Sequence, residues 1–216
     1  MTTHTFEPSA AQLDLFNQSW TRAWAALGLP VPAATVYEHV LEAYGEPQRH
    51  YHTLQHLSEA FAGLAPVLAH CQQPGAVELA MWFHDAVYDP KAKDNEKKSA
   101  SWASRVLREQ GASAEVVALV QQFIMDTQHH AQPQLPDSQI LVDVDLSILA
   151  ASAERFAEYE QQVRAEYSWV PQFLYSYKRR EILQTFLERE SIFSTDYFRE
   201  RLEAAARRNL TEALAR

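Results

Sequence analysis

The chain has 216 residues, enough to bury a sizeable core in one domain, and an ordinary globular composition with 47% hydrophobic and 22% charged residues. Its formal net charge of −9 argues against a nucleic-acid polymer as partner, because such a surface repels a polyanion. The single cysteine, Cys71, excludes an internal disulfide. No apolar run approaches the length of a membrane span, about 18 residues. The first residues lack the pattern of a signal peptide. We therefore expect a cytoplasmic protein without a membrane partner.

Apolar residues recur at helical steps of three and four along nearly the whole chain, and no segment shows the alternation typical of a strand. The first helix is expected to begin after a Ser9 cap and to end at Gly28 and Pro30. Further helices are predicted at about 36–44, 53–70, 76–88 and 95–110, then after Ser113, and at 139–150, 152–168, 171–190 and 195–214.

The predicted helix 76–88 is apolar almost all round, which is typical of a helix buried inside a bundle. No internal repeat, low-complexity tract or linker interrupts the chain. The sequence therefore predicts an all-α, single-domain helical bundle spanning residues 1–216.

Four residues, His56, the adjacent pair His84 and Asp85, and Asp145, are the most informative part of the sequence. Two imidazoles and two carboxylates are enough to hold one divalent ion with open positions. Adjacent helical residues project about 100° apart, so His84 and Asp85 reach one ion only if it lies off the edge or the end of their helix. The donor set favours Mn²⁺, Fe²⁺, Co²⁺ or Ni²⁺, with Mg²⁺ and Zn²⁺ as less favoured alternatives.

This ordered set, with its flanking residues, resembles the HD superfamily of metal-dependent phosphohydrolases. The matching segments are 49–56, 82–88, 94–100, 127–130, 143–146 and 206–210. The resemblance extends from about Trp20 to Leu214 and implies one HD-type domain with a mononuclear metal centre. It also implies that Asp145, which precedes a leucine, is the carboxylate ligand, whereas Asp143 orients a ligating histidine from outside the first coordination shell.

The resemblance further implies an acid–base role for an acidic residue soon after the His-Asp pair. Glu96 is the best candidate, although a first-turn glutamate that interacts favourably with the helix dipole is an equally open reading. Asp85 is the second candidate for proton transfer.

Three residues are candidate substrate ligands. Arg49 could present a bidentate guanidinium to a phosphate, and His52 lies one helical turn before His56. His130 could bind a phosphate oxygen or a second metal ion. Arg164, Arg179 and Arg207 also lie in family-like segments, but we assign them no catalytic role.

These features predict a metal-dependent phosphohydrolase that cleaves a small phosphate ester, such as a nucleotide, with a metal-activated water. Two alternatives stay open. The first is a di-iron HD oxygenase, and the second is a non-catalytic module that binds a metal or a nucleotide. A homo-oligomer is compatible with the sequence.

Overall fold

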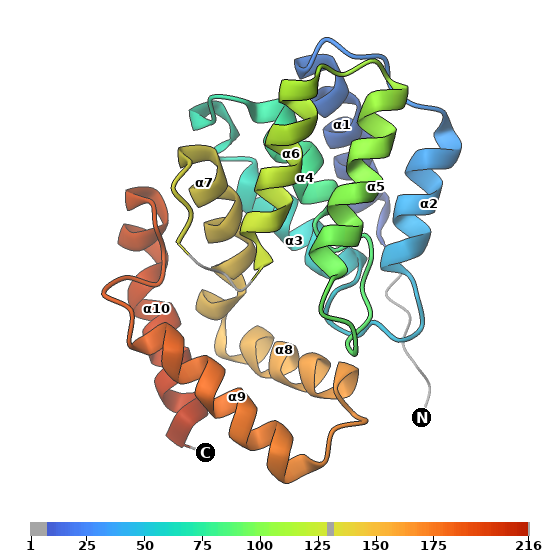
Figure 1. Ribbon diagram of the computed structural model, residues 1–216. Coiled ribbons are helices and arrows are strands. Elements are labelled where there is room, and N and C mark those ends of the chain that lie inside the picture. Colours follow the sequence, from blue (N-terminus) through green and yellow to red (C-terminus); the bar gives the residue numbers. More distant parts are fainter. Residues whose placement is uncertain (1–7, 129–131, 216) are drawn as a thin grey trace. The chain divides into compact units, whose positions relative to one another are not determined.

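The computed structural model describes residues 8–128 and 132–215, and His130 lies outside these ranges. Within them it contains ten α-helices and no strand, as the sequence predicted (Figure 1). The chain divides into two compact units, of which the first ends at Val142 and the second begins at Asp143. A single domain for the whole chain stays a prediction. None of the helices in the described ranges is both long and apolar enough to cross a membrane.

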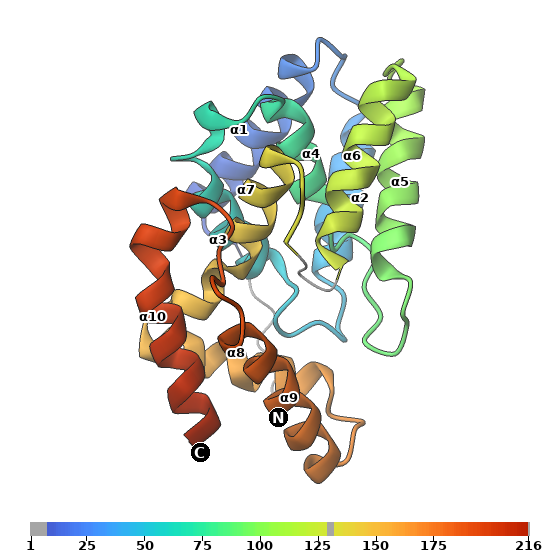
Figure 2. The same cartoon turned by 60° about the vertical axis from the view of Figure 1, so that its left-hand side comes forward.

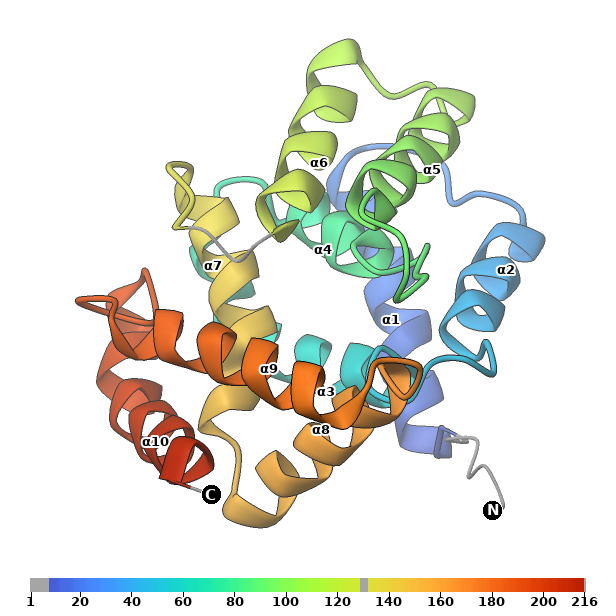
Figure 3. The same ribbon diagram turned by 60° about the horizontal axis from the view of Figure 1, so that its bottom comes forward.

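The helices of the first unit are α1 (Ala10–Ala26), α2 (Ala34–Tyr44), α3 (Leu54–Leu64), η1 (Leu68–His70), α4 (Pro74–Phe83), α5 (Asn95–Glu109), α6 (Ala114–Asp126) and most of α7 (Pro136–Asp145). The second unit holds the end of α7, η3 (Leu146–Ala150), α8 (Ala153–Glu166), α9 (Gln172–Leu187) and α10 (Asp196–Ala215), and Figure 3 shows its last three helices.

The predicted caps of two helices are confirmed. Ser9 and Ser113 accept hydrogen bonds from backbone N–H groups of the first turns of α1 and α6. The expected helix 53–70 is instead broken after Leu64, because Pro66 lacks an N–H group and its ring clashes with the preceding turn. The helix expected at 76–88 ends at Phe83, so the chain leaves helical geometry just where the His-Asp pair begins.

Helix α4 is the centre of the first unit. Nine of its ten residues are buried, and it packs against α1, α3, α5 and α6 (Figure 2). A Cβ atom at Gly75 would lie only 2.7 Å from the carbonyl oxygen of Ala23 in α1. A glycine is therefore needed for the close approach of these two helices.

One carboxylate lies inside this packed core, and it has three donors. Ser19 donates to Glu78 at 2.9 Å, and Arg22 donates to both of the Glu78 oxygens at 2.5 and 3.0 Å. Trp82 donates in turn to the Ser19 hydroxyl at 3.2 Å. Because a buried charge is tolerated only when it is paired and hydrogen-bonded, this network fixes how α1 and α4 lie against each other.

Helix α7 is anchored to the beginning of α4 by a buried carboxylate. Asp137 accepts hydrogen bonds from the backbone N–H groups of Gln72 at 2.9 Å and Gln73 at 2.7 Å. These N–H groups lie just before α4, where no helical carbonyl is available to them. Asp137 therefore supplies the cap that the local sequence lacks.

Three arginines that lie in family-like segments have structural contacts in the second unit. Arg207 donates to Glu203 and to three carbonyl groups at the end of α9. Arg164 donates to two carbonyl groups in the turn between α8 and α9, and Arg179 forms an ion pair with Glu160. These contacts explain the three arginines without a role in catalysis.

We expect Asp137→Ala to destabilise the protein by about 2 kcal/mol, because the backbone N–H groups of Gln72 and Gln73 lose a charged, buried acceptor. The change is measured as a lower midpoint in urea denaturation. Asp14→Ala is the matched control, since Asp14 is exposed on α1, and it should shift stability by less than about 0.5 kcal/mol. Equal midpoints for the two variants would show that the Asp137 cap contributes nothing.

Candidate metal centre

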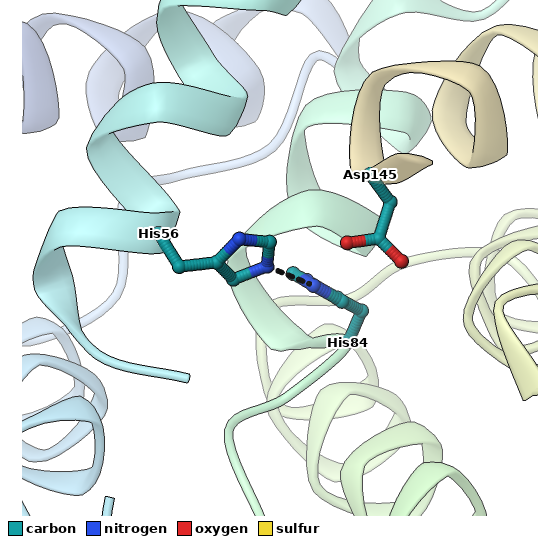
Figure 4. Close-up of side chains that lie close together, drawn as sticks. All are labelled: His56, His84 and Asp145. Atoms are coloured by element: carbon teal, nitrogen blue, oxygen red, sulfur yellow. Dashed lines mark hydrogen bonds between the residues drawn. The ribbon is translucent and has the colours of Figure 1, made fainter. Parts of the chain in front are cut away.

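Three of the four predicted metal ligands form a compact group. His56, His84 and Asp145 each offer one ligand atom, and these atoms all lie within 4.8 Å of one another (Figure 4). His56 lies in the first turn of α3, His84 caps the end of α4, and Asp145 is the last residue of α7. The group could hold a metal ion. Since α7 runs unbroken from Pro136, the helix itself carries Asp145 to this place.

The two imidazoles face each other through their Nε2 atoms, which are 3.2 Å apart. Both histidines are buried. Asp85 Oδ2 lies 3.1 Å from His84 Nε2 and 3.7 Å from His56 Nε2, so this carboxylate adjoins the same pair of nitrogen atoms. A metal-ligand role for Asp85 stays a prediction.

The hydrogen bond of His84 determines which of its nitrogen atoms is available. Nδ1 lies 2.8 Å from the carbonyl oxygen of Met81, and because a carbonyl only accepts, Nδ1 carries the proton. A neutral His84 therefore has its lone pair on Nε2, directed at His56. This is the tautomer that a metal ligand needs.

The charge of Asp85 is set by competing effects. Burial raises the pKa of its carboxyl, but the imidazoles of His84, His52 and His56 lower it by more, so the pKa lies well below its ordinary value. Asp85 is thus a carboxylate at neutral pH.

Side chains donate hydrogen bonds to one carbonyl in the last turn of α4 and to the carbonyls of residues 85–89 in the loop after it. Tyr44 donates to the carbonyl of Trp82 at 3.2 Å, and burial raises the pKa of Tyr44 to about 12, which keeps it a donor. Four other side chains donate to carbonyls of the loop. Arg49 donates to the carbonyls of residues 85 and 86, Ser99 to that of 87, Gln48 to that of 88 and Asn95 to that of 89. The loop that carries Asp85 is therefore fixed by α2, α5 and the segment before α3.

Arg49 has a different environment from the one expected. Its side chain is fully buried, and it donates to the carboxylate of Glu46 and to the carbonyls of His52, Asp85 and Ala86, the last three at 3.2, 2.6 and 3.1 Å. Four of the five guanidinium N–H groups thus bind the protein. Arg49 positions the loop, and these contacts do not support its assignment to phosphate binding.

Asp143 has several partners within the second unit. Its two oxygen atoms accept from the N–H groups of Ser194 and Thr195 and from the Thr195 hydroxyl, each at 2.7 Å. The carboxylate therefore caps the segment before α10, and its role in orienting a histidine stays a prediction.

The other predicted residues have the following positions. His52 Nε2 lies 4.0 Å from Asp85 Oδ2, and its ring stacks on Tyr88 at a centroid distance of 4.1 Å. Glu96 lies in the first turn of α5 and accepts from Gln128 at 3.2 Å. Among the described residues it has no hydrogen bond or ion pair with the histidine group, so its acid–base role stays a prediction.

Sequence reasoning missed the residues that hold the loop. Tyr44 and Gln48 carry no signal of this role, because their donors reach a carbonyl about 40 residues away. Nothing in the sequence says which backbone groups Asn95 and Ser99 bind.

We expect Arg49→Lys to weaken Mn²⁺ binding by about 10- to 100-fold, because an ammonium group cannot reproduce the fork that holds the loop carrying Asp85. Titration against a fluorescent chelator measures the affinity, and circular dichroism checks that helicity is kept. Arg108→Lys, on the exposed face of α5, is the control. An unchanged affinity in Arg49→Lys would contradict the positioning role.

The chain was compared with models of protein families, with curated protein sequences and with solved structures, and none of them matches it.

Proposed function

We propose that the protein is a metal-dependent phosphohydrolase of the HD type that cleaves a small phosphate ester, such as a nucleotide. The observation that carries this proposal is the convergence of His56, His84 and Asp145 from three helices on one point. The order of these residues along the chain supports it independently.

The spacing of the two imidazoles fits a shared ion. Two nitrogen ligands at about 2.1 Å from one metal are about 3.0 Å apart at a right angle and about 3.4 Å apart at the tetrahedral angle. The distance between the Nε2 atoms of His56 and His84, 3.2 Å, lies between these values.

The charges of the group point in the same direction. The lone pair of His84 Nε2 faces Asp85 Oδ2 at 3.1 Å, and two acceptors at this distance repel each other unless a cation lies near both. A bound divalent ion would remove this repulsion. Without an ion, a proton on one of the two histidines would have to remove it.

The chemistry follows from the donor set. A divalent ion in such a site lowers the pKa of a bound water and neutralises phosphate oxygens. Within the chain, we assign proton transfer to Asp85, which is ionised at neutral pH, and His52, stacked on Tyr88, is the partly exposed imidazole beside it. Mn²⁺, Fe²⁺, Co²⁺ and Ni²⁺ suit this mixture of nitrogen and oxygen ligands best.

Three further parts of the proposal derive from the sequence. They are a cytoplasmic location, a small phosphorylated molecule rather than a nucleic-acid polymer as substrate, and a homo-oligomer as a compatible assembly.

The metal site is tested by metal analysis of variants. We expect about one transition metal per chain in the purified protein, and His56→Ala, His84→Ala and Asp145→Ala should each remove most of it, because three donors cannot be reduced to two without a large loss of affinity. His39→Ala is the control, since His39 is exposed on α2. Full metal content in all three variants would eliminate this site.

The activity is tested by phosphate release from a panel of phosphomonoesters and nucleotides, with Mn²⁺, Co²⁺, Ni²⁺ or Mg²⁺ added. We expect release that EDTA abolishes and that His84→Ala lowers at least about 100-fold, since the water loses its activating ion. Two irons per chain with oxygen consumption and no phosphate release would favour the oxygenase. Bound metal without any turnover would favour the non-catalytic module.

A further inference from the structure

A second candidate binding site lies on the exposed side of α5. A hollow of about 570 Å³ is lined by Val87, Asp94, Lys97, Lys98, Ser101, Trp102 and Arg105. The hollow opens widely to solvent, so a ligand would lie against its floor without being enclosed. None of the lining residues belongs to the proposed metal centre.

The hollow is positively charged on an acidic protein. It contains three cations and one carboxylate, whereas the whole chain has a net charge of −9. Lys98 is paired with Asp94 at 2.8 Å, but the side chains of Lys97 and Arg105 have no hydrogen bond or ion pair with any described residue. Two cations in the hollow are therefore available to an anion.

An aromatic side chain adds an apolar surface between these cations. Trp102 is half-buried, and its ring meets the buried ring of Phe83 edge to face at a centroid distance of 5.8 Å. This contact fixes the indole, so that a flat ligand group can stack on it at little cost in side-chain entropy.

The spacing of the cations sets the size of the ligand. Lys97 and Arg105 are eight residues apart on one helix, which corresponds to about 12 Å along its axis, and Trp102 lies between them. A single inorganic phosphate cannot contact both cations and the indole. A molecule with an anionic group at one end and a flat ring at the other can contact one of the cations and the indole together.

We propose that this hollow, which we call the α5 anion site, binds a small organic anion that carries an aromatic ring, of the nucleoside monophosphate class. The phosphate pairs with Arg105, which lies one helical turn from Trp102, the base stacks on Trp102, and Lys97 adds to the positive charge of the hollow. Val87 brings the ligand against the loop that follows the His84-Asp85 pair, and the Ser99 hydroxyl holds the Val87 N–H at 3.0 Å. The site does not depend on the proposed phosphohydrolase activity.

Isothermal titration of the full-length protein with AMP at low salt tests the proposal. We expect measurable binding that the double variant Lys97→Ala/Arg105→Ala weakens by at least about tenfold, because the charge-assisted contact of Arg105 and the positive charge of Lys97 are both lost. The matched control is Arg108→Ala/Arg208→Ala, which removes the same charge from exposed positions outside the hollow and should change the affinity by less than about twofold.

Two further measurements define the ligand class and separate the two sites. Trp102→Leu should weaken the binding of AMP but not that of inorganic phosphate. The titration is repeated with EDTA, which removes a metal ion from the metal centre, and EDTA should leave binding at the α5 anion site unchanged. The proposal is overturned if AMP does not bind, if the two double variants behave alike, or if inorganic phosphate binds as tightly as AMP.

Discussion

The burial of α4 is the constraint on which the first unit depends. A helix with nine of its ten residues buried must be surrounded on all sides, and α1, α3, α5 and α6 supply these contacts. The burial of this apolar surface is the main source of stability. It also fixes the positions of the helices around α4, because the packing leaves no room even for a Cβ atom at Gly75. The end of such a helix is held rigidly, and His84 is the C-cap residue at this end of α4.

A rigid helix end has a cost, because polar groups placed there are removed from water. The chain offsets this cost with side-chain donors. Tyr44 donates to a carbonyl in the last turn of α4, and the carbonyls of residues 85–89 accept from Gln48, Arg49, Asn95 and Ser99. Some of these donors lie about 40 residues before the carbonyls that they bind, and others lie up to 14 residues after Asp85. The loop therefore contacts several helices. Such support is what holds catalytic groups in place before a ligand arrives.

Much of this arrangement could be predicted from the sequence. Helical periodicity predicted the all-α class, and three of the expected metal ligands, His56, His84 and Asp145, have ligand atoms within 4.8 Å of one another. The sequence did not predict the contacts of polar residues whose partners are distant along the chain. Arg49 and Asp143 both looked suited to a metal site, but backbone groups bind them, and nothing local in a sequence reveals which N–H or carbonyl groups will lack a partner after folding.

The side chain of Asn95 determines where the loop between α4 and α5 can accept additional residues. Its amide accepts from the N–H group and donates to the carbonyl of Asp89, at 3.1 and 2.9 Å, and so closes residues 89–95 into a small ring at the surface. Extra residues added between Lys91 and Lys93 would enlarge the ring without pulling on its base. One residue added between Ala80 and Asp85, in contrast, would rotate the histidine and the aspartate by about 100° relative to the buried helix. Evolutionary variation in length, or an inserted peptide tag, would therefore be tolerated in the ring and rejected only a few residues earlier.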